Sequence, residues 1–435
     1  GSTLIRSVRW FDAPAARLRG PSDVWLFDGR IAAITAPGAF SADPDQVIEG
    51  QGRTLLPGLW DLHAHLSPGN ALMHLAGGVT GARDLANENS DLLLLKQRIE
   101  SGEMAGPAIV PAGFIEGQGA FAARNGFVVD SLDEGLRAVD WYAARGYRQI
   151  KLYNSIRPEW VRPLARRAHR LGLKVGGHVP AFMRAEEAVR AGYDELTHIN
   201  QLMLNFLVRP GHDTRTLLRF TLVGDEARRV AADDARTRRF IALLRQRGTV
   251  VDPTLATFEA MFRQRDGEPN PSLDAIASHL PVLWRRSLRA SEMSPTAEQA
   301  QRYRASWQRM LDFVGALHRA GVPLVAGTDA AAGLMLHREL ELYVQAGIPA
   351  AEALRIATWN GPRVAGAADR SGRIAPGRPA ELLLVQGDPT LDIASVRRGV
   401  LVLQGAQAYA PAELYRALGI RPFVDGAEIV RRRRD

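Results

Sequence analysis

One pattern of hydrophobic and polar positions recurs between residues 130 and 330. Each copy has an amphipathic helical stretch, a glycine, a short apolar stretch and then a polar residue, as in YAARGYRQIKLY and AHRLGLKVGGHV. Glycine enters the left-handed cap at a helix end at little cost, and the apolar residues that follow suit a strand buried on both faces. The glycines are Gly146, Gly172, Gly192, Gly248 and Gly321. The pattern therefore predicts helices that alternate with buried strands.

Alternation of this kind implies parallel strands joined by right-handed crossovers. Three more strand candidates lie upstream, LPGLWDLHAHL, GGVTGARDL and PAIVPAGFIEG, and they bring the total to eight. Eight is the number of strands that closes a TIM-type barrel. An open doubly wound sheet is the alternative, but it needs a glycine-rich phosphate-binding turn after its first strand, and none is found there. We therefore predict an α/β protein with a TIM (β/α)8 barrel over residues 57–368.

The two ends of the chain have a different pattern. Residues 1–56 and 369–435 contain short strand patterns broken by turns, and 369–435 ends in the basic tail RRRRD. Neither end could bury a sheet face alone, so we expect both to form one small β-sandwich. Within the barrel, the stretches 201–240 and 257–305 are too long for ordinary loops and have helical periodicity. We expect them to be helical insertions over the barrel mouth, where they would shape substrate access.

Composition narrows the possible chemistry. The 435 residues are 46% hydrophobic and 23% charged, as in a soluble globular protein. No apolar run approaches the roughly 18–20 residues of a membrane span, so we expect no membrane partner. The sequence has no cysteine, which excludes disulfides, thiolate metal sites and cysteine nucleophiles.

Charge and the start of the chain say little about partners or compartment. The net charge is +8 and only three of the 55 basic residues are lysines, but the arginines are interleaved with acids in helical stretches. Such a distribution is typical of solvated helix faces, and we expect no nucleic-acid partner. The opening Gly-Ser leads directly into a strand pattern, which we interpret as a cloning remnant. Both a cytoplasmic protein and an exported one whose signal peptide was removed therefore stay open.

Polar residues gather where the predicted strands end, which is where barrel enzymes carry their chemistry. His63 and His65 share one face of the first strand, because residues two apart in a strand point the same way. A single histidine at a strand end is most often structural, but so many at one end of one barrel are not independent. Histidine and carboxylate ligands suit zinc, manganese or iron(II). The predicted metal ligands are His63, His65, Lys151, His178, His198 and Asp329.

Lys151 raises a problem of charge. An unpaired ammonium at the end of a buried strand costs several kcal/mol, and neighbouring metal ions would increase that cost. The lysine could pair with an acid, or its amine could react with carbon dioxide to give an anionic carbamate that bridges two cations. A guanidinium could not form the carbamate, so a lysine in such an arginine-rich chain favours the second possibility.

These segments resemble the amidohydrolase superfamily, on the strength of LPGLWDLHAHL, QIKLYNS, VGGHVP, ELTHIN and AGTDA. The resemblance implies a TIM barrel with a β-sandwich from both termini and a binuclear centre with a carboxylated lysine. The GARD strand and the segment with Thr358, Asn360 and Pro362 resemble Xaa-Pro and Xaa-Arg dipeptidases and bacterial ochratoxin amidohydrolases. HVPAFM departs from a common pattern of the family, in which a second histidine and a glycine follow the first, and this leaves the substrate open.

Position by position, the resemblance assigns a role to each predicted ligand. His63 and His65 would bind a buried metal ion with Asp329, while His178 and His198 would bind an exposed one. N-carboxylated Lys151 would bridge the two divalent ions, for which we expect Zn²⁺. We also expect a homo-oligomer.

The expected reaction is attack on an amide by a hydroxide held between the metal ions. Asp329 would act as general base and return the proton to the leaving amine. Tyr153 is a candidate donor to the oxyanion, or else a packed aromatic residue. A substrate carboxylate would need a cationic partner, for which the candidates are Arg83, Arg184, Arg338 and, less directly, His337. Arg83 could instead pair with Asp84, and His337 could cap a helix or support the site.

The predicted activity is hydrolysis of a small amide that releases an amino acid, from a dipeptide or an N-acyl amino acid, with ochratoxin A as one example. A mononuclear deaminase or cyclic amidase is an alternative. It normally has a glutamate shortly after the histidine of strand five, whereas the first acid after His178 is Glu186. A lactonase, esterase or phosphotriesterase also stays open. An inactive scaffold would lack ligands, and none is missing.

Overall fold

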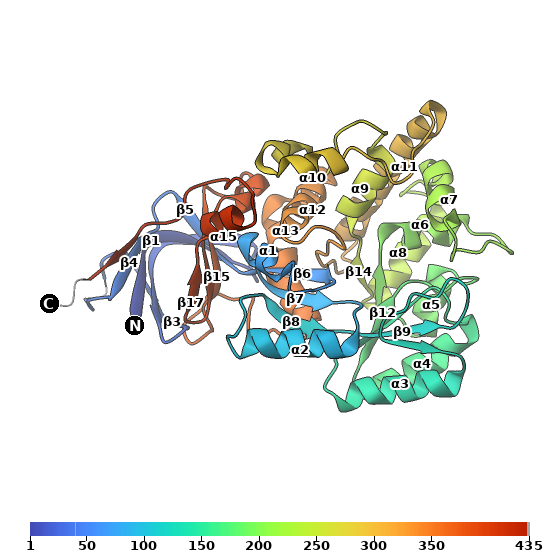
Figure 1. Cartoon of the computed structure of the whole chain (residues 1–435), viewed down its shortest axis with the longest axis horizontal. Coiled ribbons are helices and arrows are strands. Elements are labelled where there is room, and N and C mark those ends of the chain that lie inside the picture. The colour runs from blue at the N-terminus through green and yellow to red at the C-terminus, as the bar shows by residue number, and fades with distance from the viewer. Residues whose placement is uncertain (40, 433–435) are drawn as a thin grey trace.

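The computed structural model describes residues 1–39 and 41–432, so the end of the predicted basic tail, 433–435, lies outside the described residues. A sheet built from both chain ends lies on one side, and a larger unit of helices and parallel strands lies on the other (Figure 1). Within the described ranges, no helix is both long enough and apolar enough to span a bilayer.

Strands from both ends of the chain share one nine-stranded sheet. β15 pairs antiparallel with β5, which places Leu383 opposite Leu56. Alternating side chains from both ends, Ile5 and Leu384 among them, form one apolar core beneath the sheet. The strands are β1 (Ser2–Asp12), β2 (Arg17–Phe27), β3 (Arg30–Thr35), β4 (Gln46–Glu49), β5 (Arg53–Pro57), β15 (Glu381–Gln386), β16 (Gly399–Gln404), β17 (Gln407–Tyr409) and β18 (Ile429–Arg431). The arrangement of these strands as a two-layered sandwich stays a prediction.

The central strands are parallel, in the orders β6-β7-β8 and β10-β9-β11-β12-β13-β14. Only Ala112 separates β8 from β9, so the chain runs directly from one sheet into the other. The strands are β6 (Leu59–Ala64), β7 (Val79–Asp84), β8 (Ala108–Pro111), β9 (Gly113–Gly117), β10 (Phe127–Val129), β11 (Gln149–Leu152), β12 (Lys174–Gly177), β13 (Glu195–Thr197) and β14 (Val250–Asp252). The predicted α/β class with a parallel sheet is confirmed.

The segment 323–329, predicted as the eighth strand, forms backbone hydrogen bonds on both sides. The amide of Val325 donates to Val251 of β14 at 3.1 Å, and the amide of Leu62 of β6 donates to Ala326 at 2.9 Å. Backbone hydrogen bonds therefore connect the last strand of one sheet to the first strand of the other through this segment. Closure into an eight-stranded barrel stays a prediction.

The helices follow the strands as the periodicity predicts, and α3 shows the local rules. Ser131 precedes it and accepts a hydrogen bond from the amide of Glu134 at 3.1 Å, which satisfies an open amide of the first turn. All five glycines of the recurring pattern have positive φ, and Gly248 closes α8 at a φ of 64°. The helices include α1 (Ala71–Ala76), α2 (Asn89–Glu100), α3 (Leu132–Ala144), α4 (Pro158–Arg170), α5 (Ala185–Ala191), α8 (Ala235–Arg247), α11 (Ala297–Arg319) and α12 (Leu334–Gln345). Nearer the C-terminus come α13 (Ala350–Arg355), α14 (Gly361–Val364) and α15 (Pro411–Ala417).

Both long stretches between strands contain helices. The stretch 201–240 includes most of α6 (Ile199–Leu207) and all of α7 (Leu218–Glu226). The stretch 257–305 includes most of α9 (Leu255–Arg263) and all of α10 (Val282–Ser287). Helices α7 and α9 supply part of the lining of the cavity described below.

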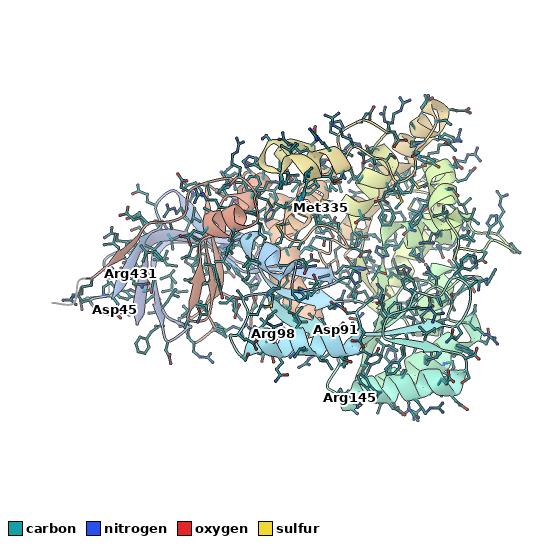
Figure 2. The ribbon with its side chains drawn as sticks, in the orientation of Figure 1. Asp45, Asp91, Arg98, Arg145, Met335 and Arg431 are labelled. Carbon is teal, nitrogen blue, oxygen red and sulfur yellow. The ribbon has the colours of Figure 1, made fainter. Side chains whose placement is uncertain are left out.

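Arginines on the outer helices fit the expected solvated faces. Arg145, at the end of α3, lies on the outer surface and stacks over the ring of Trp141 at 3.7 Å (Figure 2). Arg98 on α2 forms an ion pair with Glu103 at 3.2 Å. Exposed pairs of this kind contribute little to stability.

Candidate metal centre

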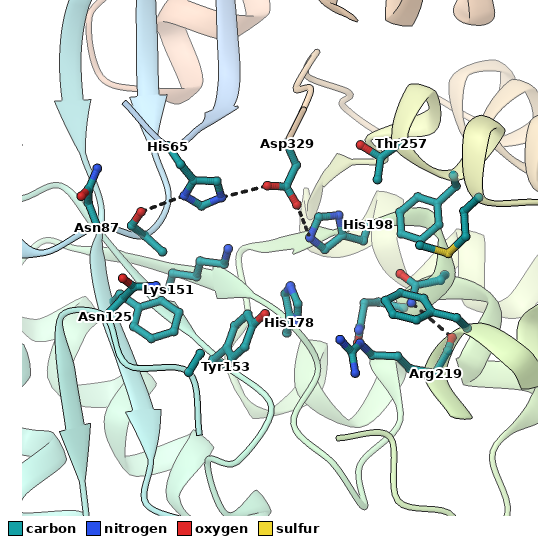
Figure 3. Close-up of a pocket in the computed structure, with 18 of the residues that line it drawn as sticks. His65, Asn87, Asn125, Lys151, Tyr153, His178, His198, Arg219, Thr257 and Asp329 are labelled. Carbon is teal, nitrogen blue, oxygen red and sulfur yellow. Dashed lines mark hydrogen bonds and ion pairs between the residues drawn. The ribbon is translucent and has the colours of Figure 1, made fainter. Parts of the chain in front are cut away.

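A cavity of about 530 Å³ is lined by residues at the carboxyl ends of the parallel strands. Five of the six predicted metal ligands line it, and Figure 3 shows their side chains facing one another across it. They are His65, Lys151, His178, His198 and Asp329. The sixth, His63, is fully buried and lies within 3.6 Å of Asp329. Ligands distant in sequence thus meet in one place, as the strand-end rule predicts.

The two histidines of the first strand are each fixed through Nδ1. Nδ1 of His63 lies 2.7 Å from Oδ2 of Asp252, and Nδ1 of His65 lies 2.7 Å from the carbonyl oxygen of Ala86. An ionised carboxylate or a carbonyl oxygen accepts hydrogen bonds, so both Nδ1 atoms donate, and Nε2 of His63 keeps a lone pair. Nε2 of His63 is buried and has no hydrogen-bond partner among the described residues. Nε2 of His65 lies 2.8 Å from Oδ1 of Asp329.

The other two histidines repeat this arrangement. Nδ1 of His178 lies 2.8 Å from the side-chain oxygen of Asn154, and Nδ1 of His198 lies 2.7 Å from the hydroxyl of Thr254. Their rings are 4.8 Å apart between centroids. Proteins commonly orient metal-binding histidines by a hydrogen bond at the other ring nitrogen. Four imidazoles held in this way form a donor set that suits divalent cations.

Asp329 lies at the centre of the cluster. Its carboxylate lies within 4.0 Å of Nε2 of His63, His65 and His198. One ligand atom each from His63, His198 and Asp329 lies within 4.8 Å of the others, close enough for one ion. The backbone φ is 51° at Asp329 and 69° at His198. Non-glycine residues at positive φ are strained by about 1–3 kcal/mol, and such strain gathers at functional sites.

Asp61 holds the strand ends that carry these ligands in register. Its Oδ2 accepts a hydrogen bond from the Thr328 hydroxyl at 2.7 Å, and its Oδ1 accepts the amide of His63 at 3.0 Å. The carboxyl is fully buried, and this burial raises its pKa to about 7. Asp61 therefore ties the residue before Asp329 to the backbone of His63.

Burial favours the neutral form of three of the four imidazoles. It lowers the pKa of His63, His178 and His198 well below the ordinary value. A histidine must be neutral to bind a metal ion. Burial acts in the opposite sense on Asp329, but the adjacent His63 and His65 outweigh it and hold the pKa of the carboxyl well below its usual range. Burial also acts to lower the pKa of His65, but the hydrogen bond to Asp329 outweighs it and raises that pKa. The site therefore presents three neutral imidazoles, and a fourth that is paired with the ionised carboxylate of Asp329.

Lys151 is buried, and the described residues include no carboxylate within ion-pair distance of it. Its amine points toward the histidines (Figure 3). Burial lowers the pKa of the amine, while the charges of Asp329 and Asp252 raise it by less. The described residues therefore offer no acid for a structural salt bridge, which was the alternative to a carbamate. The neutral amine, which burial favours, is the form that reacts with carbon dioxide.

Tyr153 lines the cavity next to Lys151. Its ring centroid lies 4.1 Å from that of His178 and 5.1 Å from that of Phe114. Burial raises the pKa of the phenol, so the hydroxyl keeps its proton at neutral pH. The side chain is thus both packed at the rim, as one interpretation expected, and able to donate a hydrogen bond.

Two of the arginines predicted to bind the substrate, Arg83 and Arg338, do not line the cavity, and each is paired with a buried glutamate. Arg83 is buried and binds Glu195, with Nη1 3.0 Å from Oε1, so the suggested pairing with Asp84 is wrong. Arg338 binds Glu259 through two hydrogen bonds of 2.8 and 2.7 Å. A guanidinium neutralised in this way is not available to a substrate carboxylate.

The other two candidates also lie outside the lining. Arg184 forms an ion pair with Glu187 at 2.9 Å and lines a separate hollow. His337 is buried inside α12, where its Nε2 donates to the carbonyl of Gly77 at 2.6 Å. It holds α12 against Gly77, the residue that caps the end of α1.

Three residues that orient the histidines were not predicted, namely Asp252, Asn154 and Thr254. Asp252 could have been found, because it ends the strand pattern in TVVDPT just as the ligands end theirs. Arg219, which lines the cavity from α7, was also missed. It lies inside an insertion, where no periodicity indicates which side chains face the site.

The sequence profile of the amidohydrolase family matches residues 54–406. This chain belongs to the amidohydrolase family. It is 25% identical over 414 residues to an uncharacterised protein of Mycobacterium tuberculosis, which covers 89% of this chain and 92% of that protein. It is also 38% identical to a dihydroorotase of Thermus aquaticus, but over only 96 residues, which span 20% of this chain and 21% of the dihydroorotase.

Solved structures with a similar fold include other amidohydrolases and peptidases. A Xaa-Pro dipeptidase with bound methionine has a TM-score of 0.69 at 19% identity and covers 94% of this chain and 100% of its own. Bottromycin amidohydrolase has a TM-score of 0.74 at 23% identity, with coverages of 97% and 91%. A. niger ochratoxinase has a TM-score of 0.66 at 18% identity, with coverages of 94% and 95%. As a member of the amidohydrolase family, this chain is a hydrolase, and its histidines and Asp329 could hold a metal ion.

Proposed function

We propose that this amidohydrolase-family protein is a metal-dependent amide hydrolase that releases an amino acid from a dipeptide or an N-acyl amino acid, with ochratoxin A among the candidates. One observation carries the proposal. Four histidines, each fixed at Nδ1, and an ionised aspartate converge on a cavity that also holds a buried lysine without an acid partner among the described residues. The proposal includes a closed (β/α)8 barrel, supported by the backbone hydrogen bonds of residues 323–329 to β14 and β6.

The donor set supports two metal sites. In this proposal His63, His65 and Asp329 would hold one divalent ion, His178 and His198 would hold the other, and Lys151, once N-carboxylated, would contribute a further ligand. Zn²⁺ suits these nitrogen and oxygen ligands. When bound, two such ions polarise an amide carbonyl and lower the pKa of water to about 7.

The chain's own residues would move the protons. The low pKa of Asp329 keeps its carboxylate ionised, so it can accept a proton from the attacking water. It then passes that proton to the departing nitrogen, because an amine leaves poorly unless it is protonated. The phenol of Tyr153 is placed to donate a hydrogen bond to the carbonyl oxygen as negative charge develops there. Phe220, Phe258 and Met261 line the same cavity and make part of its wall apolar.

The proposal is tested by measuring amino-acid release from a panel of dipeptides and N-acyl amino acids that includes ochratoxin A. We expect release by the wild-type protein, loss after chelator treatment and recovery with Zn²⁺. Asp329→Asn should lower the rate by about 10²–10⁴-fold, the range for a lost general base, and by more if metal is also lost. No release from any member of the panel by protein with two bound metal ions would refute the amidase and direct the search to lactones and phosphotriesters.

A further inference from the structure

Arg219 lies in the wall of the cavity that holds the histidines. It is the second residue of α7, in the insertion after β13, and its guanidinium points into the cavity from the side opposite His65 (Figure 3). It is partly buried, and this burial lowers its pKa. Among the described residues that line the cavity, it is the only arginine.

The guanidinium of Arg219 is held by its own helix and has no anionic partner among the described residues. Nη1 donates to the carbonyl oxygens of Arg215 and Thr216 at 3.1 and 3.0 Å. Cζ lies 4.3 Å from the ring centroid of Phe220. In the part of the chain that the structure describes, no carboxylate lies within 4.0 Å of it, unlike Arg215, whose Nη2 binds Asp213 at 2.8 Å. Its other N–H groups are therefore available to an anion in the cavity.

Asn200 adds an acceptor next to this cation. It is buried and lines the cavity, and its Nδ2 donates to the backbone carbonyl of Arg219 at 3.3 Å. Its Oδ1 is buried without a hydrogen-bond partner among the described residues. A buried polar atom without a partner is costly, so a ligand N–H at this point would be stabilising. An amino acid joined through an amide offers both groups, a carboxylate and a nearby N–H.

We propose that Arg219 binds the free carboxylate of the substrate, with Asn200 accepting the neighbouring N–H. The inference rests on the proposed function and assigns recognition of the substrate's free carboxylate and amide N–H to two residues of the cavity wall. Phe220, Phe258 and Met261 line the same cavity, so the substrate's side chain is apolar or aromatic. Arginine suits this role because its planar fork matches a carboxylate through two parallel hydrogen bonds.

The test compares two probes that differ only in charge, N-acetyl-L-phenylalanine and N-acetyl-L-phenylalaninamide, through release of phenylalanine or its amide. We expect the wild-type protein to prefer the acid. Arg219→Gln should raise KM for the acid by about 10–100-fold with little change in kcat, since a charge-assisted hydrogen bond is worth about 1.5–3 kcal/mol. Hydrolysis of the amide probe should be unchanged, and Arg219→Lys should recover part of the loss. Arg145→Gln, an exposed arginine that stacks on Trp141 as Arg219 stacks on Phe220, is the matched control and should behave as wild type.

Equal loss on both probes in Arg219→Gln, with unchanged metal content and melting temperature, would overturn the role of Arg219 while amide hydrolysis stands. Equal hydrolysis of both probes by the wild-type protein would overturn that role in the same way. If the wild-type protein hydrolyses neither probe, the panel of dipeptides and N-acyl amino acids tests the proposed function separately, and binding decides on Arg219. Calorimetry with the Asp329→Asn protein should then show binding of the acid that Arg219→Gln abolishes. If the acid does not bind to the Asp329→Asn protein, or binds equally well after Arg219→Gln is added, the inference is refuted.

Discussion

Lys151 places an amine in the buried part of the site, where a permanent positive charge would be destabilising. It is buried beside neutral imidazoles and finds no acid partner among the described residues. We predict that Lys151→Arg loses one of two bound zinc ions and at least about 100-fold of activity, the upper end of the loss caused by outer contacts of a metal site. Lys151→Ala should lose the same ion but regain part of its activity with added acetate, which would substitute for the proposed carbamate. Zinc content by mass spectrometry and the rate with acetate check both statements, and a Lys151→Arg protein with two zinc ions would contradict them.

Asp252 acts on the site through His63. It fixes the tautomer of that ring through the 2.7 Å contact at Nδ1, and burial raises its own pKa to about 7. Asp252→Asn keeps the shape of the side chain but can turn an amide N–H toward the ring. We predict a loss of zinc affinity of about 10–100-fold, measured by competition with a chromophoric chelator. Activity at saturating zinc should recover to a large extent. Unchanged zinc affinity would show that the contact does not orient the ring.

Among the secondary-structure elements, β7 and β13 are tied through the interior by a buried ion pair. Arg83 contacts both Glu195 and Gln149, whose side-chain oxygen lies 2.8 Å from Nη1. Arg83→Met leaves Glu195 buried without its cation, and we predict a loss of about 3–5 kcal/mol in the free energy of unfolding. The double variant Arg83→Met/Glu195→Met removes both charges and should recover most of that loss. Urea unfolding measures both, and a double variant no more stable than the single one would contradict the explanation.

Two buried histidines make the end of α1 sensitive to acid. Burial lowers the pKa of His74 to about 4 and, together with Arg397, the pKa of His337 to about 3. Unfolded histidine titrates near 6.5, so the unfolded state binds more protons below that pH. The stability from these groups is therefore complete above pH 6.5 and falls by about 1.4 kcal/mol per pH unit per group toward pH 4.

The check for this pH dependence is a melting series from pH 7.5 to 4.5 with wild type and His74→Leu. The variant lacks one of the two groups, so its melting temperature should fall less over that range than that of the wild type. Parallel curves for the two proteins would mean that His74 does not contribute to the acid sensitivity.

The packing of strands and helices also shows what periodicity could and could not predict. The strand-end rule placed His63, Lys151 and Asp329 correctly in one region, because backbone geometry alone brings the carboxyl ends of parallel strands together. The rule could not predict which side chains pair with one another. Arg83 meets Glu195 across the interior, and only the packed structure reveals which distant acid neutralises which arginine. Arg219 lies in an insertion without a strand pattern, so no sequence signal distinguished it from the many surface arginines.

At the scale of the whole molecule, the N-terminal and C-terminal segments together form one sheet. β5 and β15 pair with Leu56 opposite Leu383, so neither end has a complete sheet or core alone. The short strand patterns at both ends predicted that the two ends fold together. They did not predict the order of the nine strands, because register depends on side chains that meet only after long loops close. The family profile from residue 54 to 406 agrees with this, since it extends from β5 into the C-terminal strands.

In the proposed function, two metal ions at the histidine cluster carry amide hydrolysis. The decisive experiment adds Zn²⁺ in steps to chelator-treated protein and follows amino-acid release from the best member of the panel. We predict a rate near zero without metal, a rise that is complete at two zinc ions per chain, and no rise in Asp329→Asn. Amino-acid release that survives complete removal of metal, or that is complete at one ion per chain, would contradict the binuclear hydrolase.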